Sequence, residues 1–346
     1  MKREKTVHAI DWANVEKYLR AHIEGLPDRE MRVQKFTEGF SNLTYMIQIG
    51  DWKAVLRRPP FGYIPPKAHD MQREYRILEK IHPVYPYAPK PYIYSEDDEI
   101  MDKHFYLMEK KDGVVVDREI PEEFGNYPDV GKQMSEAIIA ALSQLQNIDV
   151  KEAGLESLGK PDGYVERQVV GWKKRLDRAK TSGLRNVEDL EKWLADNIPE
   201  NNKVSVIHND FKLNNMMFDR DDPGKIIGVF DWEMATIGDP LTDLGSTLAY
   251  WSGEGDPYTG ISSITSMPGF YSRREFLERY TKVSGMDVSN MDFYLTFGFY
   301  KLAGIMQQLY HRWEIGEVKD DRFSTLQQGV NNLIEMAEEA KDNKLL

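Results

Sequence analysis

One short segment constrains the fold of this chain more than any other, because several polar residues follow an apolar run in a fixed order. The run at 204–207 predicts a buried strand, and the segment HNDFKLNN (208–215) follows it directly. A second apolar run at 226–230 leads into Asp231. We expect these two strands to bring one His, two Asp and one Asn to the same place.

The spacing of these residues favours one kind of chemistry. Four residues separate Asp210 from Asn215, and Asp231 lies 231 − 210 = 21 positions after Asp210. Phosphoryl transfer needs one carboxylate to accept the proton of a substrate hydroxyl, and an amide with a second carboxylate to hold Mg²⁺ on the phosphates. The pattern therefore predicts a small-molecule kinase.

The composition is that of an ordinary globular protein. The chain has 346 residues, which suits two lobes, and 41% of them are hydrophobic and 29% charged. No apolar run reaches the roughly 18 residues of a membrane span. The basic N-terminus has no apolar run behind it, so we expect no signal peptide. Cysteine is absent, which excludes disulfides and a Cys nucleophile and agrees with an expected cytoplasmic location.

The net charge limits the partners that we expect. A formal charge of −12 argues against general binding to nucleic acid or to an anionic membrane. The expected partner is a small molecule with a hydroxyl group, and the oligomeric state stays open.

The N-terminal part predicts a sheet that carries a phosphate-binding loop. Alternation at 43–49, a turn at Gly50-Asp51 and a returning strand at 52–57 indicate a hairpin. A loop precedes it, and its backbone N–H groups could contact phosphate oxygens. An ordinary turn is the alternative, since the loop has one glycine. The candidate nucleotide-binding residues of this loop are Gly39, Phe40, Ser41 and Asn42.

Arg57, at the end of the returning strand, is a second candidate for nucleotide binding. In the kinase plan, a cation here pairs with the α- and β-phosphates and with a Glu on the following helix. The apolar positions of 71–81 predict that helix, and Glu74 lies within it. A solvated charge pair of little energetic consequence is the alternative.

The predicted boundary between the lobes follows a strand at 104–109. Met108 and Glu109 are candidates there, because backbone groups at such a hinge can hydrogen-bond an adenine edge. We expect a nucleotide-binding lobe at 1–109 and a catalytic, acceptor-binding lobe at 110–346. The second lobe should be mostly helical, since apolar periodicity predicts helices at 134–145, 164–178, 187–198, 241–250, 274–283, 293–310 and 323–341. The fold class is α+β.

Two local features of the second lobe carry further expectations. The segment 253–269 is rich in Gly, Pro and Ser, and its length predicts either a cover over the substrate or a flexible linker. No dense acidic cluster lies around 251–256. Ser289, with Asp292 three residues on, is similar to a capping box.

At this point the residues resemble a known family. HNDFKLNN followed by GVFDWEMATIGDPLTDLG resembles the aminoglycoside phosphotransferase and choline kinase-like superfamily. The resemblance is strongest to the branch whose kinase-like domain is fused to acyl-CoA dehydrogenases. It extends over most of the chain, through FTEGFSNLTY, AVLRRPP, REYRIL, LMEKKDG, GYVERQVVGW, PGFYSRREFLERY and FYLTFGFYKLAGI.

The resemblance implies a bilobal protein-kinase-like fold that binds ATP (or GTP) and Mg²⁺ between its lobes. It also implies a small hydroxylated acceptor, such as a hydroxylated acyl-CoA or another metabolite. Residue by residue, Asp210 matches the catalytic base and His208 the residue that braces the catalytic loop. Asn215 and Asp231 match the metal ligands. Arg57 falls where most kinases have the phosphate-binding Lys, with Glu74 as its partner.

Two departures from the family pattern keep other interpretations open. Arg57 replaces the usual Lys. A guanidinium presents several N–H donors in a plane, whereas an ammonium is a compact point charge. Asn209 stands where the superfamily has Gly, although Asn tolerates left-handed backbone angles better than most residues. These departures favour the main alternative, a nucleotide-binding pseudokinase or scaffold. A metal-dependent hydrolase that uses His208, Asp210 and Asp231 is the other.

Overall fold

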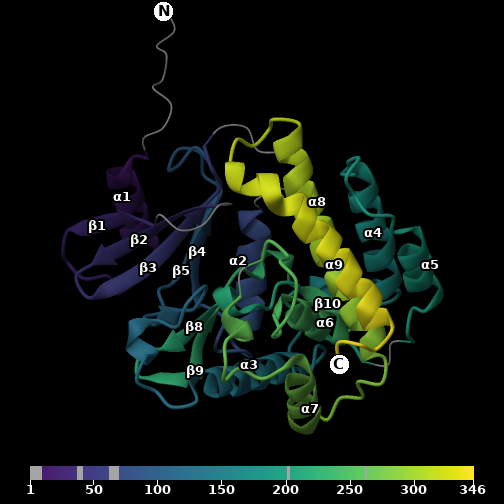
Figure 1. The fold of residues 1–346 in the computed structure, drawn as a ribbon. Helices are drawn as coiled ribbons and strands as arrows, with labels where there is room; N and C mark the ends of the chain where they lie inside the picture. Colours follow the sequence, from purple (N-terminus) through teal and green to yellow (C-terminus); the bar gives the residue numbers. More distant parts are fainter. Residues whose placement is uncertain (1–9, 37–41, 62–69, 201–202, 262) are drawn as a thin grey trace, which may run out of the picture. The chain divides into compact units, whose positions relative to one another are not determined.

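The computed structural model describes residues 10–36, 42–61, 70–200, 203–261 and 263–346 (Figure 1). The predicted loop residues Gly39, Phe40 and Ser41 lie outside the described residues. The chain divides into two compact units, Met1–Asp112 and Gly113–Leu346, whereas the division expected from the sequence follows Glu109.

The first unit is built on a five-stranded sheet in which every neighbouring pair is antiparallel, in the order β1-β2-β3-β5-β4. The predicted hairpin is confirmed, and Ile49 pairs with Trp52 across its turn. The elements of this unit are α1 (Trp12–His22), β1 (Met31–Lys35), β2 (Leu43–Ile49), β3 (Trp52–Arg58), α2 (Met71–Ile81), β4 (Pro91–Ser95) and β5 (Phe105–Glu109).

Strand alternation decides which face of this sheet each helix covers. Leu56 and its neighbours on one face form a core with Val15 and Leu19 of α1. Arg57 comes one residue later, so its side chain points to the opposite face. Glu74 of α2 contacts Arg57 there. The two helices therefore cover opposite faces, and the sequence places Arg57 on the face of α2.

The second unit is mostly helical and holds two small sheets. One sheet has the order β6-β8-β9, and β7 pairs with β10 in the other. The elements of this unit are β6 (Val114–Val115), η1 (Glu122–Phe124), α3 (Val130–Gln146), η2 (Glu156–Leu158), α4 (Tyr164–Arg178), α5 (Glu188–Asp196), β7 (Ser205–Ile207), η3 (Leu213–Asn215), β8 (Met216–Asp219), β9 (Asp222–Val229), η4 (Trp232–Met234), β10 (Thr236–Gly238), α6 (Leu241–Tyr250), η5 (Ile264–Ser266), α7 (Arg273–Ser284), α8 (Met291–Glu314), η6 (Asp321–Thr325) and α9 (Leu326–Lys341).

Helix α8 forms much of the core of the second unit, because it packs against α4, α6 and α9 (Figure 1). Its approach to α6 depends on glycine. A Cβ on Gly298 would lie 2.4 Å from the carbonyl oxygen of Gly245, and one on Gly245 would lie 2.2 Å from that of Tyr294. Backbone therefore packs directly on backbone at this crossing, which holds the two helices in one register.

Within the described ranges, no helix is both long and apolar enough to cross a lipid bilayer.

Candidate active site

The polar segment 208–215 forms a turn between β7 and β8, as its position after an apolar run predicts. The two predicted strands lie in different sheets: β7 pairs with β10, while β9 pairs with β8. Two contacts of Phe230 nevertheless join them. Its N–H donates to the Asn215 carbonyl oxygen at 2.9 Å, and its own carbonyl oxygen lies 2.8 Å from His208 Nε2. Asp231 follows Phe230 directly, so His208, Asn215 and Asp231 lie close to one another.

His208 connects these turns from a fully buried position. Because Nε2 faces a carbonyl oxygen, it carries the proton and donates. Nδ1 then accepts the amide N–H of Asp210 at 3.3 Å. The Trp232 ring lies edge-on to the imidazole, with 4.7 Å between ring centroids. Burial lowers the pKa of His208, so the ring is neutral near pH 7. These contacts agree with a residue that braces the turn.

The Asp210 carboxylate accepts three side-chain contacts. Asn215 Nδ2 donates to Oδ2 at 2.9 Å, the Tyr250 hydroxyl donates to Oδ1 at 3.0 Å, and Lys212 Nζ lies 2.9 Å from Oδ2. Burial raises the pKa of this carboxyl, but Lys212, His208 and Lys301 together outweigh burial and the net pKa is lowered. Asp210 is therefore ionised near pH 7.

The Asp210 carboxylate can accept one more hydrogen bond. A carboxylate offers about four acceptor positions, and three are used by Asn215, Tyr250 and Lys212. The side chain is 21% exposed, so an incoming group can reach it. A substrate hydroxyl could donate to the remaining position.

Asn209 gives the turn its left-handed backbone conformation, with a φ of 69°. The carboxylate of Asp243 accepts the backbone N–H groups of His208 at 2.6 Å and Asn209 at 2.7 Å. Lys301 Nζ, on α8, donates to the Asn209 carbonyl oxygen at 2.7 Å. The side-chain oxygen of Asn209 accepts from the Tyr164 hydroxyl at 3.0 Å, and its Nδ2 donates to Met234 O at 3.0 Å.

The predicted metal ligands offer oxygen donors of the type that Mg²⁺ prefers. Asn215 uses its Nδ2 group on Asp210, which leaves its side-chain oxygen to face a cation. Asp231 sits at the start of η4 with a φ of 61°. Among the described residues, no group of three or more His, Asp or Glu side chains forms a metal site. An amide and one or two carboxylates fit Mg²⁺, which keeps several waters and phosphate oxygens as ligands.

In the first unit, the predicted Arg57–Glu74 pair is present. Arg57 Nη1 lies 2.6 Å from Glu74 Oε1, and the two side chains are 10% and 1% exposed. This is a buried pair, which contradicts the interpretation as a solvated one. Asn42 is buried at the start of β2. Met108 is buried in β5, and the Glu109 carboxylate pairs with Lys111 at 3.0 Å.

Comparisons with known proteins agree with this arrangement. The model of the phosphotransferase enzyme family matches residues 32–270 of the chain. The chain belongs to this family.

Sequence relatives of this phosphotransferase family member are longer proteins. It is 32% identical to human acyl-CoA dehydrogenase family member 11 over 89% of its own length, and 32% identical to mouse acyl-CoA dehydrogenase family member 10 over 96%. The chain spans 40% and 31% of these relatives, respectively.

Solved structures agree on the fold of this phosphotransferase family member. One is described as a candidate aminoglycoside phosphotransferase from Ralstonia eutropha; its TM-score is 0.83 at 25% identity, over 97% of this chain and 99% of the other. The choline kinase of Cryptosporidium parvum has a TM-score of 0.66 at 11% identity, over 97% and 98%. The predicted protein-kinase-like fold, with an antiparallel N-terminal sheet and a larger helical C-terminal part, is therefore confirmed.

Three residues of the site did not follow from the sequence pattern: Lys212, Tyr250 and Lys301. Lys212 lies inside the motif itself, and its charge two residues after Asp210 was the available signal. Lys301 is the one charged residue of the apolar stretch 293–306 within α8, which is unusual enough to indicate a buried partner. Tyr250 ends α6 and carries no local signal, because only the packing of α6 brings it to Asp210.

Proposed function

We propose that this protein is a small-molecule kinase, which transfers the γ-phosphoryl group of ATP or GTP to a hydroxyl of a small acceptor with the help of Mg²⁺. The observation that carries the proposal is the state of Asp210. Its carboxylate is ionised, held by three side chains and still open to one donor.

In the proposed reaction, Asp210 accepts a hydrogen bond from the acceptor hydroxyl and orients its oxygen towards the γ-phosphorus. A bond forms between that oxygen and phosphorus, the bond from phosphorus to the bridging oxygen breaks, and the nucleoside diphosphate leaves with the electron pair. The hydroxyl proton passes to Asp210. Because the lowered pKa makes this carboxylate a weak base, its main contribution is positioning, as expected for a loose transition state.

Other residues of the chain support the same role. Asn215 and Asp231 would hold Mg²⁺, which supplies charge neutralisation on the phosphates. Lys212, beside the Asp210 carboxylate, adds positive charge where negative charge gathers on the transferred group. Arg57, held by Glu74, is the proposed contact to the α- and β-phosphates. Met108 and Glu109 are proposed to contact the base through their backbone groups.

The solved relatives support nucleotide use. A spectinomycin phosphotransferase with a TM-score of 0.59 was solved with ADP and spectinomycin. A hygromycin-binding aminoglycoside phosphotransferase variant, with a TM-score of 0.57, was solved with ADP and hygromycin B. The sequence relatives carry acyl-CoA dehydrogenase names, so a hydroxylated acyl-CoA is one acceptor to include in a screen.

Thermal unfolding tests the nucleotide site. The melting temperature is measured with ATP, GTP or ADP, each with and without Mg²⁺, for the wild type and for Asp231→Ala. Ligand at about 100 times its dissociation constant adds roughly 2.7 kcal/mol of stability. We expect a Mg²⁺-dependent shift that the variant loses. No shift with any nucleotide would refute the proposal.

Turnover tests the role of Asp210. Asp210→Asn is expected to abolish phosphoryl transfer while the Mg²⁺-nucleotide shift remains, because the neutral amide holds the acceptor hydroxyl more weakly than the carboxylate does and cannot take its proton. A wild type that binds nucleotide but phosphorylates no acceptor would instead support the pseudokinase alternative.

A further inference from the structure

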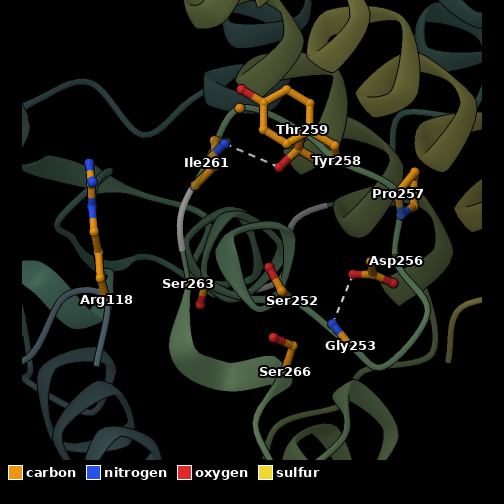
Figure 2. A pocket seen from close by; sticks show the side chains of 11 residues that line it. Arg118, Ser252, Gly253, Asp256, Pro257, Tyr258, Thr259, Ile261, Ser263 and Ser266 are labelled. Atoms are coloured by element: carbon orange, nitrogen blue, oxygen red, sulfur yellow. Dashed lines mark hydrogen bonds between the residues drawn. The ribbon is translucent and has the colours of Figure 1, made fainter. Parts of the chain in front are cut away.

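A pocket of about 450 Å³ lies in the second unit, in the loop that follows α6 (Figure 2). This is the segment for which the sequence left a choice between a substrate cover and a linker. Its size falls within the range of small-molecule sites. Hydroxyl-bearing residues are frequent in its wall, which includes Arg118, Ser252, Asp256, Thr259, Ser263 and Ser266.

Two contacts place this pocket beside the catalytic turn. Tyr250, which donates to Asp210, precedes Ser252 of the wall by two residues. On the other side, Asn214 Nδ2 lies 3.5 Å from Asp117 Oδ1, and Arg118 of the wall follows Asp117. Two residues span at most about 7 Å. Each wall is therefore connected to the turn that carries Asp210 through one side-chain contact and one or two residues of backbone, and no residue of the turn itself lines the pocket.

The available charge of the pocket is positive. The Asp256 carboxylate is already used, because it accepts the Gly253 N–H at 2.8 Å and pairs with Arg273. Arg118 is 71% exposed, and its one polar contact among the described residues is Asp117, at 3.6 Å. That distance is too long for a hydrogen bond. Glu254 belongs to the same loop but does not line the pocket. A polycationic acceptor would therefore find no open carboxylate among the lining residues, and the half-exposed carboxylate of Asp117 beside Arg118 lies outside this lining.

The remaining polar groups are hydroxyls. Figure 2 shows Ser252 and Ser266 near each other among the lining residues, with Ser263 to their left and Arg118 farther to the left. Ser263 Oγ pairs with Thr265 Oγ1 at 2.8 Å. Ser252 and Ser266 make no side-chain hydrogen bond to any other described residue. Each hydroxyl can donate and accept, so together they suit a ligand with several hydroxyl groups.

We propose that this pocket binds the phosphoryl acceptor, and that the acceptor is a polyhydroxylated molecule with an anionic group, carboxylate or phosphate, that pairs with Arg118. This assignment rests on the proposed kinase function, since it names the substrate class of the same site. It separates this protein from enzymes that select polycationic acceptors.

Four matched six-carbon probes test the proposal by direct binding, without nucleotide. D-Gluconate carries a carboxylate, sorbitol 6-phosphate a phosphate, sorbitol no charge and D-glucamine an ammonium group. Affinities are measured by isothermal titration calorimetry, with ligand-observed NMR for weak binding. We expect at least one anion to bind on the order of tenfold more tightly than sorbitol, as a charge-assisted hydrogen bond provides, and glucamine to bind most weakly. The anion that binds more tightly shows whether the pocket selects a carboxylate or a phosphate.

Variants of Arg118 supply the decisive comparison. Arg118→Gln should remove the preference for the anion, and Arg118→Lys should keep part of it. Arg220→Gln is the matched control, because Arg220 is an exposed arginine of the same unit that pairs with Glu123 and does not line the pocket. The control should bind all four probes as the wild type does.

The outcomes separate this proposal from the kinase proposal. Equal affinity for sorbitol and both anions, preference for glucamine, no binding of any probe, or an unchanged anion affinity in Arg118→Gln would each overturn the assignment. The nucleotide shift would still stand in those cases. Conversely, an Arg118-dependent anion preference without any nucleotide shift would refute the kinase function and leave an anion-binding pocket.

Discussion

At the scale of single residues, Asn209 stands in the turn at 208–215 at the position where the resemblance implies glycine. A glycine at this position would adopt the positive φ without strain. Asn209 adopts it as well, at 69°, and adds two side-chain hydrogen bonds, to Tyr164 and to Met234. The sequence predicted the backbone tolerance of Asn but not these bonds, because both partners come from distant parts of the chain.

Substitutions of Asn209 should separate backbone strain from the hydrogen bonds. Asn209→Gly loses two bonds but relieves the strain, so we expect a loss of about 1 kcal/mol in the free energy of unfolding. Asn209→Ala loses the same bonds and keeps the strain, so the loss should be about 2–3 kcal/mol. Urea unfolding measures both. An alanine variant as stable as the glycine variant would contradict the role given to φ.

The buried carboxyl of Asp243 should make the stability of the folded protein depend on pH. Burial raises the pKa of this carboxyl to about 6, although the N–H groups of His208 and Asn209 and the nearby Lys301 lower it. An acid with a raised folded-state pKa binds its proton more readily when folded. Its contribution therefore favours the folded state most below pH 4, and this advantage is lost as the pH rises to about 6.

The measurement is thermal unfolding between pH 4 and 8 for the wild type and Asp243→Asn. The wild type should lose up to about 3 kcal/mol relative to the variant as the pH rises from 4 to 6, since the pKa differs by about two units from that of the unfolded chain. Parallel stability curves for the two proteins would show that Asp243 does not titrate in this range.

At the scale of helices and strands, α6 and α8 together anchor the turn at 208–215. Asp243 lies on α6 and Lys301 on α8, and they contact the N–H and the carbonyl oxygen of Asn209. The glycine contact between the two helices allows this approach. A shift of α8 along α6 would therefore withdraw Lys301 from the turn.

Removing the Lys301 cation should be costly. Lys301→Met leaves the Asp243 carboxylate buried without the cation that lowers its pKa, and we expect a loss of about 3 kcal/mol in stability. The turnover number should fall more than the Michaelis constant for nucleotide changes, because the turn carries Asp210. Lys282→Met, on the exposed face of α7, is the control and should change neither. A similar loss in both variants would argue against the specific contact.

Most elements were predictable, and the failures have local reasons. Helices α2 and α4 follow from apolar periodicity, and their bounds match the prediction. The capping box expected at Ser289 is wrong: Ser289 bonds Asp287 instead, and α8 begins after Asn290 without a side-chain cap. The structure has its capping box at Ser272 and Glu275, before α7. That segment also fits the sequence rule, so the pattern alone did not distinguish the two.

At the scale of the whole molecule, the net negative charge of the chain opposes the binding of anionic phosphates, which membership of a phosphotransferase family implies. A formal charge of −12 must be overcome locally wherever an anion binds. Buried Arg57, Lys212 at the turn and exposed Arg118 provide local positive charge at the proposed phosphate, transition-state and acceptor contacts. The sequence predicted the first of these, but not the other two, because their roles depend on which loops meet.

This charge predicts behaviour towards polyanions. The protein should pass through a heparin column in buffer with about 0.1 M salt, since long-range repulsion outweighs isolated cations. Elution with the void volume is the expected result. Retention that requires high salt for release would reveal a basic surface and contradict the expectation that nucleic acid is not a partner.

The bonds around Asn209 also affect how the protein is made. The turn at 208–215 is anchored by Tyr164, Asp243 and Lys301, and the last of these is synthesised 301 − 209 = 92 residues after Asn209. A nascent chain that ends before α8 can form the first sheet but cannot lock this turn. Because such long-range contacts form late, the turn at 208–215 reaches its final geometry only after α8 has been synthesised.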